Sequence, residues 1–169
     1  MIKTERLTLI PLTPQQLESG LKSIKSLAAD LNIPIVEDLM TGVAEQAVRM
    51  KIEKMRSVAP SLHPWFTYWL IVIDCENIGA GMAGFKGNPN EDGEVEIGYG
   101  INSIYQSRGY MSEAVRALIK WAFSHPECKA INATDVRPDN YSSQKVLVKC
   151  GFSEIKADGT GISYQLRKD

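Results

Sequence analysis

A strand of strict alternation that leads, through a short glycine-containing loop, into an amphipathic helix constrains this chain more than any other feature. Residues 94–101 (EVEIGYGI) place Val95, Ile97, Tyr99 and Ile101 on one face and Glu94, Glu96, Gly98 and Gly100 on the other. This period of two is that of a β-strand. Residues 110–123 then carry apolar side chains at helical spacing. A strand joined in this way to a helix indicates an α/β chain.

Other segments extend the pattern along the sequence. The residue types and their spacing predict strands over residues 2–10, 65–75, 78–85, 94–101, 130–136, 152–156 and 162–167. They predict helices near Thr13 and over residues 44–59, 110–123 and 140–150, the last ended by Gly151. We expect residues 27–42 to be irregular, because Pro34 and Gly42 interrupt them. The sequence shows no repeat, so we expect one domain over residues 1–169.

Composition excludes several classes of protein. The chain has 169 residues and a formal net charge of −1, which argues against a nucleic-acid-binding protein. Its three cysteines lie far apart and form no CxxC pair, so we expect neither a metal site nor a thiol redox site. The N-terminus does not resemble a signal peptide, and the longest apolar run, residues 65–73, is too short to span a membrane. We therefore expect a cytoplasmic protein without membrane contact.

Residues 79–84 (GAGMAG) fit the pattern G-x-G-x-x-G that binds dinucleotides. That interpretation requires a helix directly after the glycines, whereas residues 85–89 (FKGNP) are unsuited to begin one. A glycine-rich strand packed closely against its neighbours is the favoured alternative.

The loop at residues 106–111 (QSRGYM) is the better candidate for an anion site. It lies between the strand of residues 94–101 and the helix of residues 110–123. Backbone N–H groups at the start of a helix can converge on a phosphate, and the helix dipole assists them. Gly109 would permit a positive φ or a close approach of the ligand. The alternative is an ordinary helix start with a conformational glycine.

Five segments, taken together and in order, resemble the GNAT superfamily of N-acetyltransferases, and within it the branch that acetylates the N-termini of ribosomal proteins. They are residues 4–7 (TERL), 96–99 (EIGY), 106–114 (QSRGYMSEA), 140–143 (NYSS) and 149–152 (KCGF). The resemblance implies an α/β (α+β) GNAT fold. Such a fold has a mixed, mostly antiparallel sheet of about six to seven strands, helices on both faces and a V-shaped splay after the fourth strand.

The resemblance also implies acetyl-CoA as the co-substrate. The pyrophosphate would be held by Gln106, Ser107, Arg108, Gly109, Tyr110, Met111 and Ser112. The pantetheine would pair with the backbone of Ile97, Gly98, Tyr99, Gly100 and Ile101. Asn140 and Ser143 would face the cofactor arm, although Asn140 or Asp139 can equally be a helix cap. Met111 departs from the small residue that the family's loop carries, and we expect binding to survive because the donor is a backbone N–H.

For catalysis, the resemblance favours Glu96 as the base that receives the amine proton, with Glu94 as the second candidate. The alternative is that both are ordinary exposed strand carboxylates. Leu147 stands where many relatives carry a tyrosine acid. Ser143 is then a candidate hydrogen-bond donor to the CoA sulfur, and a backbone N–H near Ile97 and Gly98 is the candidate oxyanion donor.

The acceptor is expected to be a primary amine. Residues 26–48 contain four acidic residues and no Lys or Arg. If this segment forms a wall of the acceptor site, its charge favours a cationic acceptor. The alternative is a solvated segment whose charge says nothing about the acceptor. A homodimer is possible by resemblance. The unusual Met111 and the missing tyrosine leave a second hypothesis open, a non-catalytic regulatory protein that binds acyl-CoA.

Overall fold

The computed structural model describes residues 1–158 and 161–169, and its centre is an open sheet. In the described residues the sheet has eight strands in the order β1-β2-β3-β4-β5-β6-β8-β7, and every pair is antiparallel except β5 with β6. The strands are β1 (Ile2–Lys3), β2 (Leu7–Pro11), β3 (Trp69–Ile73), β4 (Ile78–Phe85), β5 (Glu94–Ile101), β6 (Ala130–Val136), β7 (Ser153–Asp158) and β8 (Gly161–Arg167). The mixed, mostly antiparallel architecture is as expected, with eight strands where six to seven were predicted.

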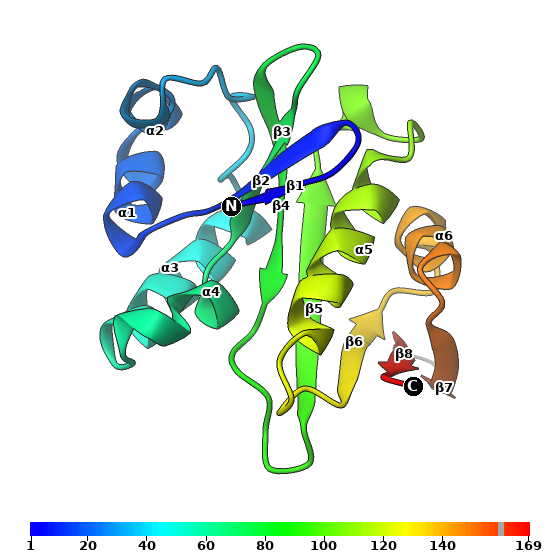
Figure 1. Cartoon of the computed structure of the whole chain (residues 1–169). Coiled ribbons are helices and arrows are strands. Elements are labelled where there is room, and N and C mark those ends of the chain that lie inside the picture. Colours follow the sequence, from blue (N-terminus) through cyan, green and yellow to red (C-terminus); the bar gives the residue numbers. More distant parts are fainter. Residues whose placement is uncertain (159–160) are drawn as a thin grey trace.

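Helices cover both faces of this sheet (Figure 1). They are α1 (Pro14–Lys22), α2 (Ile24–Leu31), α3 (Val43–Arg56), α4 (His63–Phe66), α5 (Tyr110–Phe123) and α6 (Tyr141–Lys149), with 3-10 turns η1 (Pro60–Leu62) and η2 (Ser103–Tyr105). One apolar core joins α5 to the sheet, and a second joins α1, α2 and α3 to the other face. No helix in the described ranges is long and apolar enough to cross a bilayer.

Local signals in the sequence predicted several elements closely. The bounds of β4, β5, α5 and β6 are those expected, and α1 begins after Thr13 with a reciprocal cap between Thr13 and Gln16. Gly151 ends α6 with a φ of +91°. The glycine-rich segment is the strand β4 and approaches its neighbours closely, because a Cβ on Gly81 would lie 2.6 Å from the carbonyl oxygen of Gly100.

Three expected elements are wrong in their extent. Residues 2–10 form two strands, because Thr4 closes a turn in which its backbone N–H donates to the Leu7 carbonyl oxygen at 2.9 Å. Residues 24–31, partly expected to be irregular, form α2, which ends at Asn32 in the left-handed conformation. Trp65 belongs to the short helix α4 instead of β3, and its ring packs 4.4 Å from the ring of Trp121 in the core.

The pairing of β5 with β6 positions the site. Their register covers only Glu94–Glu96 of β5, so the two strands part beyond Glu96. This divergence is the splay expected after the strand of residues 94–101, which is the fifth strand of the structure. The closed end is held by Glu94, which accepts hydrogen bonds from Asn132 Nδ2 at 2.9 Å and Gln165 Nε2 at 3.2 Å. The open end leaves room beside the C-terminal half of β5.

Candidate functional site

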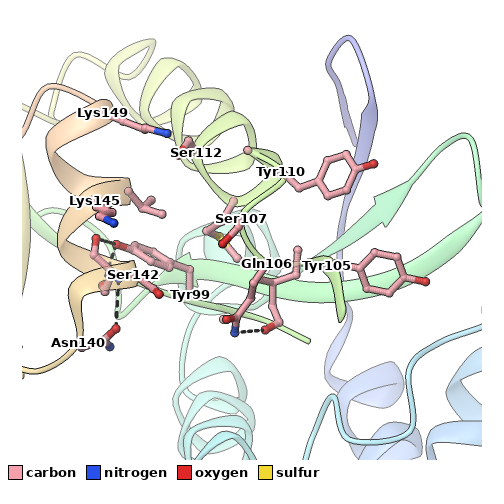
Figure 2. Close-up of a pocket in the computed structure, with 16 residues that line it drawn as sticks. Tyr99, Tyr105, Gln106, Ser107, Tyr110, Ser112, Asn140, Ser142, Lys145 and Lys149 are labelled. Atoms are coloured by element: carbon pink, nitrogen blue, oxygen red, sulfur yellow. Dashed lines mark hydrogen bonds between the residues drawn. The ribbon is translucent and has the colours of Figure 1, made fainter. Parts of the chain in front are cut away.

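A cleft with a volume of about 450 Å³ lies between the end of β5, the start of α5 and α6 (Figure 2). Eleven of the residues predicted to bind the cofactor line it: Tyr99, Gly100, Ile101, Gln106, Ser107, Gly109, Tyr110, Met111, Ser112, Asn140 and Ser143. The structure thus brings together three segments that are separated in the sequence. Ile97, Gly98 and Arg108 lie outside this lining.

The loop before α5 presents a continuous row of unused hydrogen-bond donors. The backbone N–H groups of residues 107–112 have no acceptor within the described part of the chain. Ser107 and Gly109 have φ values of +61° and +83°, and such left-handed residues within a turn curve successive N–H groups around one point. The three last N–H groups open the fourteen-residue helix α5, whose dipole adds partial positive charge. This arrangement suits a phosphate group.

The Met111 side chain is 7% exposed and belongs to the main apolar core. The core therefore accommodates most of its bulk, although the residue also touches the cleft.

Two lysines in the lining were not predicted. Lys145 and Lys149 lie one turn apart on α6 and line the cleft together with Tyr105, Ser142 and Val146. The lining contains no Asp or Glu among the described residues. The signal in the sequence was the spacing i, i+4 within a predicted helix, which places both side chains on one face. The cleft is therefore suited by charge to an anion.

Tyr99 and α6 meet at the inner end of the cleft. The Tyr99 hydroxyl donates to the Ser143 carbonyl oxygen at 3.2 Å and lies 3.0 Å from Ser143 Oγ. Burial raises the pKa of Tyr99 to about 12, against the smaller lowering effect of the Ser143 hydrogen bond. Asn140 is the cap of α6, since its Oδ1 accepts from the Ser143 N–H at 3.1 Å, and it also lines the cleft. Both predicted roles of Asn140 are thus compatible.

The two candidate bases do not line the cleft. Glu94 is engaged at the closed end of the splay, where Arg167 Nη2 adds an ion pair at 3.5 Å. Glu96 Oε1 accepts from Thr134 Oγ1 at 2.6 Å and from Lys86 Nζ, while its Oε2 has no partner within residues 1–158 and 161–169. The Glu96 side chain is 26% exposed, so water can reach part of it.

A second hollow, of about 500 Å³, lies on the other face of β5, between the strand and α3. It shares Tyr99, Gly100, Ile101 and Gln106 with the cleft. Gly100 pairs with Met82 of β4, so Glu96, Gly98 and Gly100 share the face of Met82, which packs into the core of α1–α3. A Cβ on Gly98 or Gly100 would meet no atom within 4 Å.

Most of the lining of the second hollow is apolar. It includes Val36, Leu39, Val43, Ala44, Ala47, Tyr68 and Met82. Of the four acidic residues in the segment 26–48, only Asp38 lines it, held by a 2.7 Å hydrogen bond from Asn102 Nδ2. Glu45 instead pairs with Arg49 at 2.8 Å, and Asp30 accepts from Ser19 Oγ at 2.7 Å. The wall therefore combines apolar side chains with Asn102, Ser103 and Gln106 and has a single carboxylate.

No group of three or more His, Cys, Asp or Glu side chains arranged for a metal ion occurs in the described ranges.

The chain matches a family model, curated relatives and solved structures. The family model described as "Acetyltransferase (GNAT) domain" matches residues 6–153. A curated relative, "Uncharacterized N-acetyltransferase YjdG" of Bacillus subtilis (strain 168), is 40% identical over 87 residues, which are 52% of this chain and 51% of that protein. The match thus spans about half the length of this relative.

Solved structures share the fold. The ribosomal-protein-S5-alanine acetyltransferase from Vibrio fischeri superposes with a TM-score of 0.66 at 18% identity, covering 99% of this chain and 96% of that one. The Microcin C7 self immunity acetyltransferase MccE, in complex with acetyl-CoA and AMP, superposes with a TM-score of 0.63 at 13% identity, covering 98% and 94%.

Proposed function

This chain belongs to the GNAT acetyltransferase family, and from that premise we propose that it transfers the acetyl group of acetyl-CoA directly to a primary amine, at a protein N-terminus or on a small molecule. The observation that carries the proposal is the row of unused N–H groups over residues 107–112, which opens beside a strand that borders both hollows. The two hollows would hold the two substrates.

The cleft fits acetyl-CoA in charge and in backbone chemistry. The N–H groups of residues 107–112 would hold the pyrophosphate, and Lys145 and Lys149 would add charge for phosphate groups. The Glu96 carbonyl oxygen accepts from the N–H of Lys86, the residue that follows β4. Because the direction of hydrogen bonding alternates along a strand, the groups of Ile97, Tyr99 and Ile101 point to the side where β6 has parted. The pantetheine amides would pair with that free edge.

The same alternation distinguishes the two candidate oxyanion donors. The Ile97 N–H points to β6, beside the Glu96–Asn132 pair at which the two strands begin to part, whereas the Gly98 N–H points to β4. We therefore assign to Ile97 the N–H that would stabilise the negative oxygen formed when the amine nitrogen attacks the thioester carbon. The thiolate of CoA leaves as the amide bond forms.

Glu96 would receive the proton that the amine loses, through a water bound at its Oε2. The Ser143 hydroxyl would donate a hydrogen bond to the departing sulfur when the neutral Tyr99 hydroxyl donates to Ser143 Oγ instead of to the Ser143 carbonyl oxygen. A CoA thiol resembles cysteine in acidity, with a pKa of about 8.5. A hydrogen bond is therefore enough to help the thiolate leave, although position 147 carries leucine instead of a tyrosine acid. The Leu147 side chain is buried in the core and offers no donor.

The acceptor would enter through the second hollow. Its apolar wall suits an acceptor with an apolar body, and Asp38 supplies one site for a cationic group at the end of the hollow near Asn102. An α-amine has a pKa of about 7.7–8.0 and a lysine amine about 10.4, so protein N-termini need less help from a base.

The test measures CoA release with a panel of N-terminal peptides, lysine-like amines and apolar primary amines, together with calorimetry of acetyl-CoA binding. We expect turnover on part of the panel. Glu96→Gln should lower kcat by roughly 10- to 100-fold on lysine-like amines, and less on α-amines, with unchanged acetyl-CoA affinity.

Glu94→Gln is the matched control, because Glu94 lies two residues before Glu96 on the same face of β5, and this variant should retain turnover. Equal loss in both variants would remove Glu96 from the mechanism. Binding of acetyl-CoA without turnover on the whole panel would instead favour the second candidate, an acyl-CoA-binding regulator, which the buried Leu147 and the engagement of Glu96 by Lys86 support.

A further inference from the structure

We propose that Arg6, in the turn between β1 and β2, is a positioning residue that orients the loop of residues 107–112 for the phosphates of acetyl-CoA. This inference rests on the proposed function of that loop. It gives a role to the segment Thr4–Leu7, which no part of the proposed chemistry uses.

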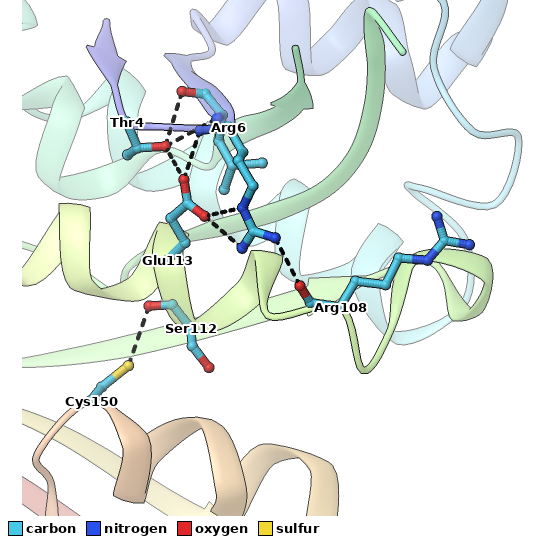
Figure 3. Close-up of polar contacts among 7 residues, drawn as sticks. Thr4, Arg6, Arg108, Ser112, Glu113 and Cys150 are labelled. Atoms are coloured by element: carbon cyan, nitrogen blue, oxygen red, sulfur yellow. Dashed lines mark hydrogen bonds and ion pairs between the residues drawn. The ribbon is translucent and has the colours of Figure 1, made fainter. Parts of the chain in front are cut away.

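Arg6 connects the N-terminal turn to both the loop and α5 (Figure 3). Its Nε and Nη2 each lie 2.7 Å from Glu113 Oε2, and its backbone N–H donates to Glu113 Oε1 at 2.9 Å. Its Nη1 donates to the Arg108 carbonyl oxygen at 3.1 Å, and its guanidinium lies 4.7 Å above the centre of the Tyr110 ring. Thr4 Oγ1 donates to Glu113 Oε1 at 2.6 Å. One guanidinium therefore holds residues on both sides of Gly109.

The bond to the Arg108 carbonyl oxygen sets the direction of the next N–H. In a trans peptide the carbonyl of one residue and the N–H of the following residue point in opposite directions, and no cis peptide occurs in the described ranges. Arg6 draws the Arg108 oxygen away from the cleft, so the Gly109 N–H turns toward it. Gly109 lines the cleft and Arg108 does not, in agreement with this geometry.

Arg6 also neutralises a carboxylate directly after the loop of residues 107–112. Glu113 lies in the first turn of α5, where an unpaired negative charge would repel a diphosphate. Burial acts to raise the pKa of Glu113, but hydrogen bonds from Thr4 and Arg6 outweigh it and the pKa is lowered. Glu113 is therefore ionised, and Arg6 is the cation that compensates it.

The experiment compares Arg6→Gln and Arg6→Lys with the wild type by calorimetry of acetyl-CoA and by steady-state kinetics. Lysine keeps the charge beside Glu113 but has one nitrogen, so it cannot bind Glu113 and the Arg108 oxygen in the fork geometry of arginine. We expect both variants to raise Kd and KM for acetyl-CoA by about tenfold or more, the fold-change typical of a lost charge-assisted hydrogen bond. At saturating acetyl-CoA, kcat and the acceptor KM should stay within about twofold, because the contact lies far from the reacting atoms.

Two controls separate positioning from folding. Thr4→Val removes the hydrogen bond that Thr4 Oγ1 donates to Glu113 and the one that it accepts from the Leu7 N–H, and it leaves the Arg6 side chain in place. It should therefore lower the urea midpoint without changing acetyl-CoA affinity. Arg56→Gln removes the remote 2.9 Å ion pair with Glu18 and should change neither.

The outcomes distinguish this inference from the proposed function. A wild-type protein that binds no acetyl-CoA would overturn the proposed function itself. A wild-type protein that binds it, with Arg6→Lys folded and equal to it in affinity, would overturn the role of Arg6 alone. If Thr4→Val weakened acetyl-CoA binding as much as Arg6→Lys, the network would be a structural element only and the positioning role would also fall.

Discussion

The two hollows beside β5 share part of one strand, yet they differ in the charged groups that line them: two lysines in one and a single carboxylate in the other. The cleft at α5 offers backbone N–H groups, hydroxyls and two lysines. Arg6 binds the loop of this cleft through the Arg108 carbonyl oxygen and binds α5 through Glu113. The hollow at α3 offers mostly apolar side chains and one carboxylate. Gly100 and Tyr99 stand at the junction of the two.

The difference in lining indicates which kind of ligand each hollow is suited to hold. Backbone groups bind a phosphate whatever side chains surround them, so a cleft built from them is suited to one fixed ligand. Side chains on a helix can change without disturbing the backbone, so a hollow built from them is suited to a ligand that differs between relatives. Changes in the loop should therefore affect acetyl-CoA, and changes in α3 should affect the acceptor.

The largest expected effect comes from Gly109→Val. Gly109 has a φ of +83°, and a Cβ there would lie 3.3 Å from Arg6 Nη2, so valine would both strain the loop and push against the guanidinium. We expect calorimetry to show a loss of acetyl-CoA affinity of about 100-fold or more, since several N–H groups would turn away together.

Gly151→Val is the matched control for this change. Gly151 also has a positive φ, of +91°, but it ends α6 and does not line the cleft. This variant should lower the melting temperature and keep its affinity for acetyl-CoA. Unchanged affinity in Gly109→Val would show that the loop does not bind the phosphates.

A smaller and more selective effect is expected from Ala44→Arg. Ala44 lines the hollow at α3, and an arginine there would fill the hollow and place a cation in its wall. The acceptor KM should rise by about tenfold, as expected for lost apolar burial and added charge repulsion, while acetyl-CoA affinity stays constant.

Met50→Arg provides the comparison on the same helix, because Met50 is 62% exposed and lies outside the hollow. It should leave both constants unchanged. A weakened affinity for acetyl-CoA in Ala44→Arg, with no effect on the acceptor, would contradict the division between the two hollows.

The residues that line the cleft at α5 could largely be predicted from the sequence because their signals are local. The loop, the glycine and the helix that it opens follow one another within residues 106–123, so their order fixes their geometry. Resemblance to the family then added the N-terminal end of α6. The lysines of the cleft could have been found from their spacing, and only their direction depended on tertiary packing.

The acceptor side could not be predicted in the same way, because its features depend on contacts across the sheet. Glu94 and Glu96 are equivalent in an alternating strand, and contacts with other strands and loops separate them. Glu94 accepts from Asn132 of β6 and Gln165 of β8, while Glu96 accepts from Thr134 of β6 and from Lys86. The acidic character of residues 26–48 was likewise a property of the sequence and not of the wall. Only Asp38 lines the hollow: Asp30 lies on α2 and bonds Ser19, Glu45 pairs with Arg49, and Glu37 lies outside the lining.

The two sides also differ in how they hold a buried charge, and Lys51 provides the most subtle test. On the cofactor side Glu113 has Arg6 as its counter-charge. On α3, Lys51 is 6% exposed and donates to the carbonyl oxygens of Phe66 at 3.3 Å and Phe85 at 2.5 Å, with the Tyr68 ring 4.4 Å away. Burial, with smaller contributions from the nearby charges of Lys54 and Lys86, lowers the pKa of Lys51 to about 7.

This lowered pKa makes the stability of the protein depend on pH in a defined direction. Between about pH 7 and pH 10.4 the unfolded chain keeps the Lys51 proton and the folded chain has released it, so the free energy of unfolding rises with pH by up to about 1.4 kcal/mol per unit. This gain in the free energy of unfolding is lost as the pH falls to about 7, the pKa of Lys51 in the folded chain. Lys51→Met should remove the slope while leaving other titrating groups in place. Urea unfolding of the wild type and of Lys51→Met at pH 6, 7.5 and 9 measures the slope as the difference between their free energies of unfolding. An equal dependence on pH in both proteins would show that Lys51 remains charged in the fold, so that this region tolerates an uncompensated cation.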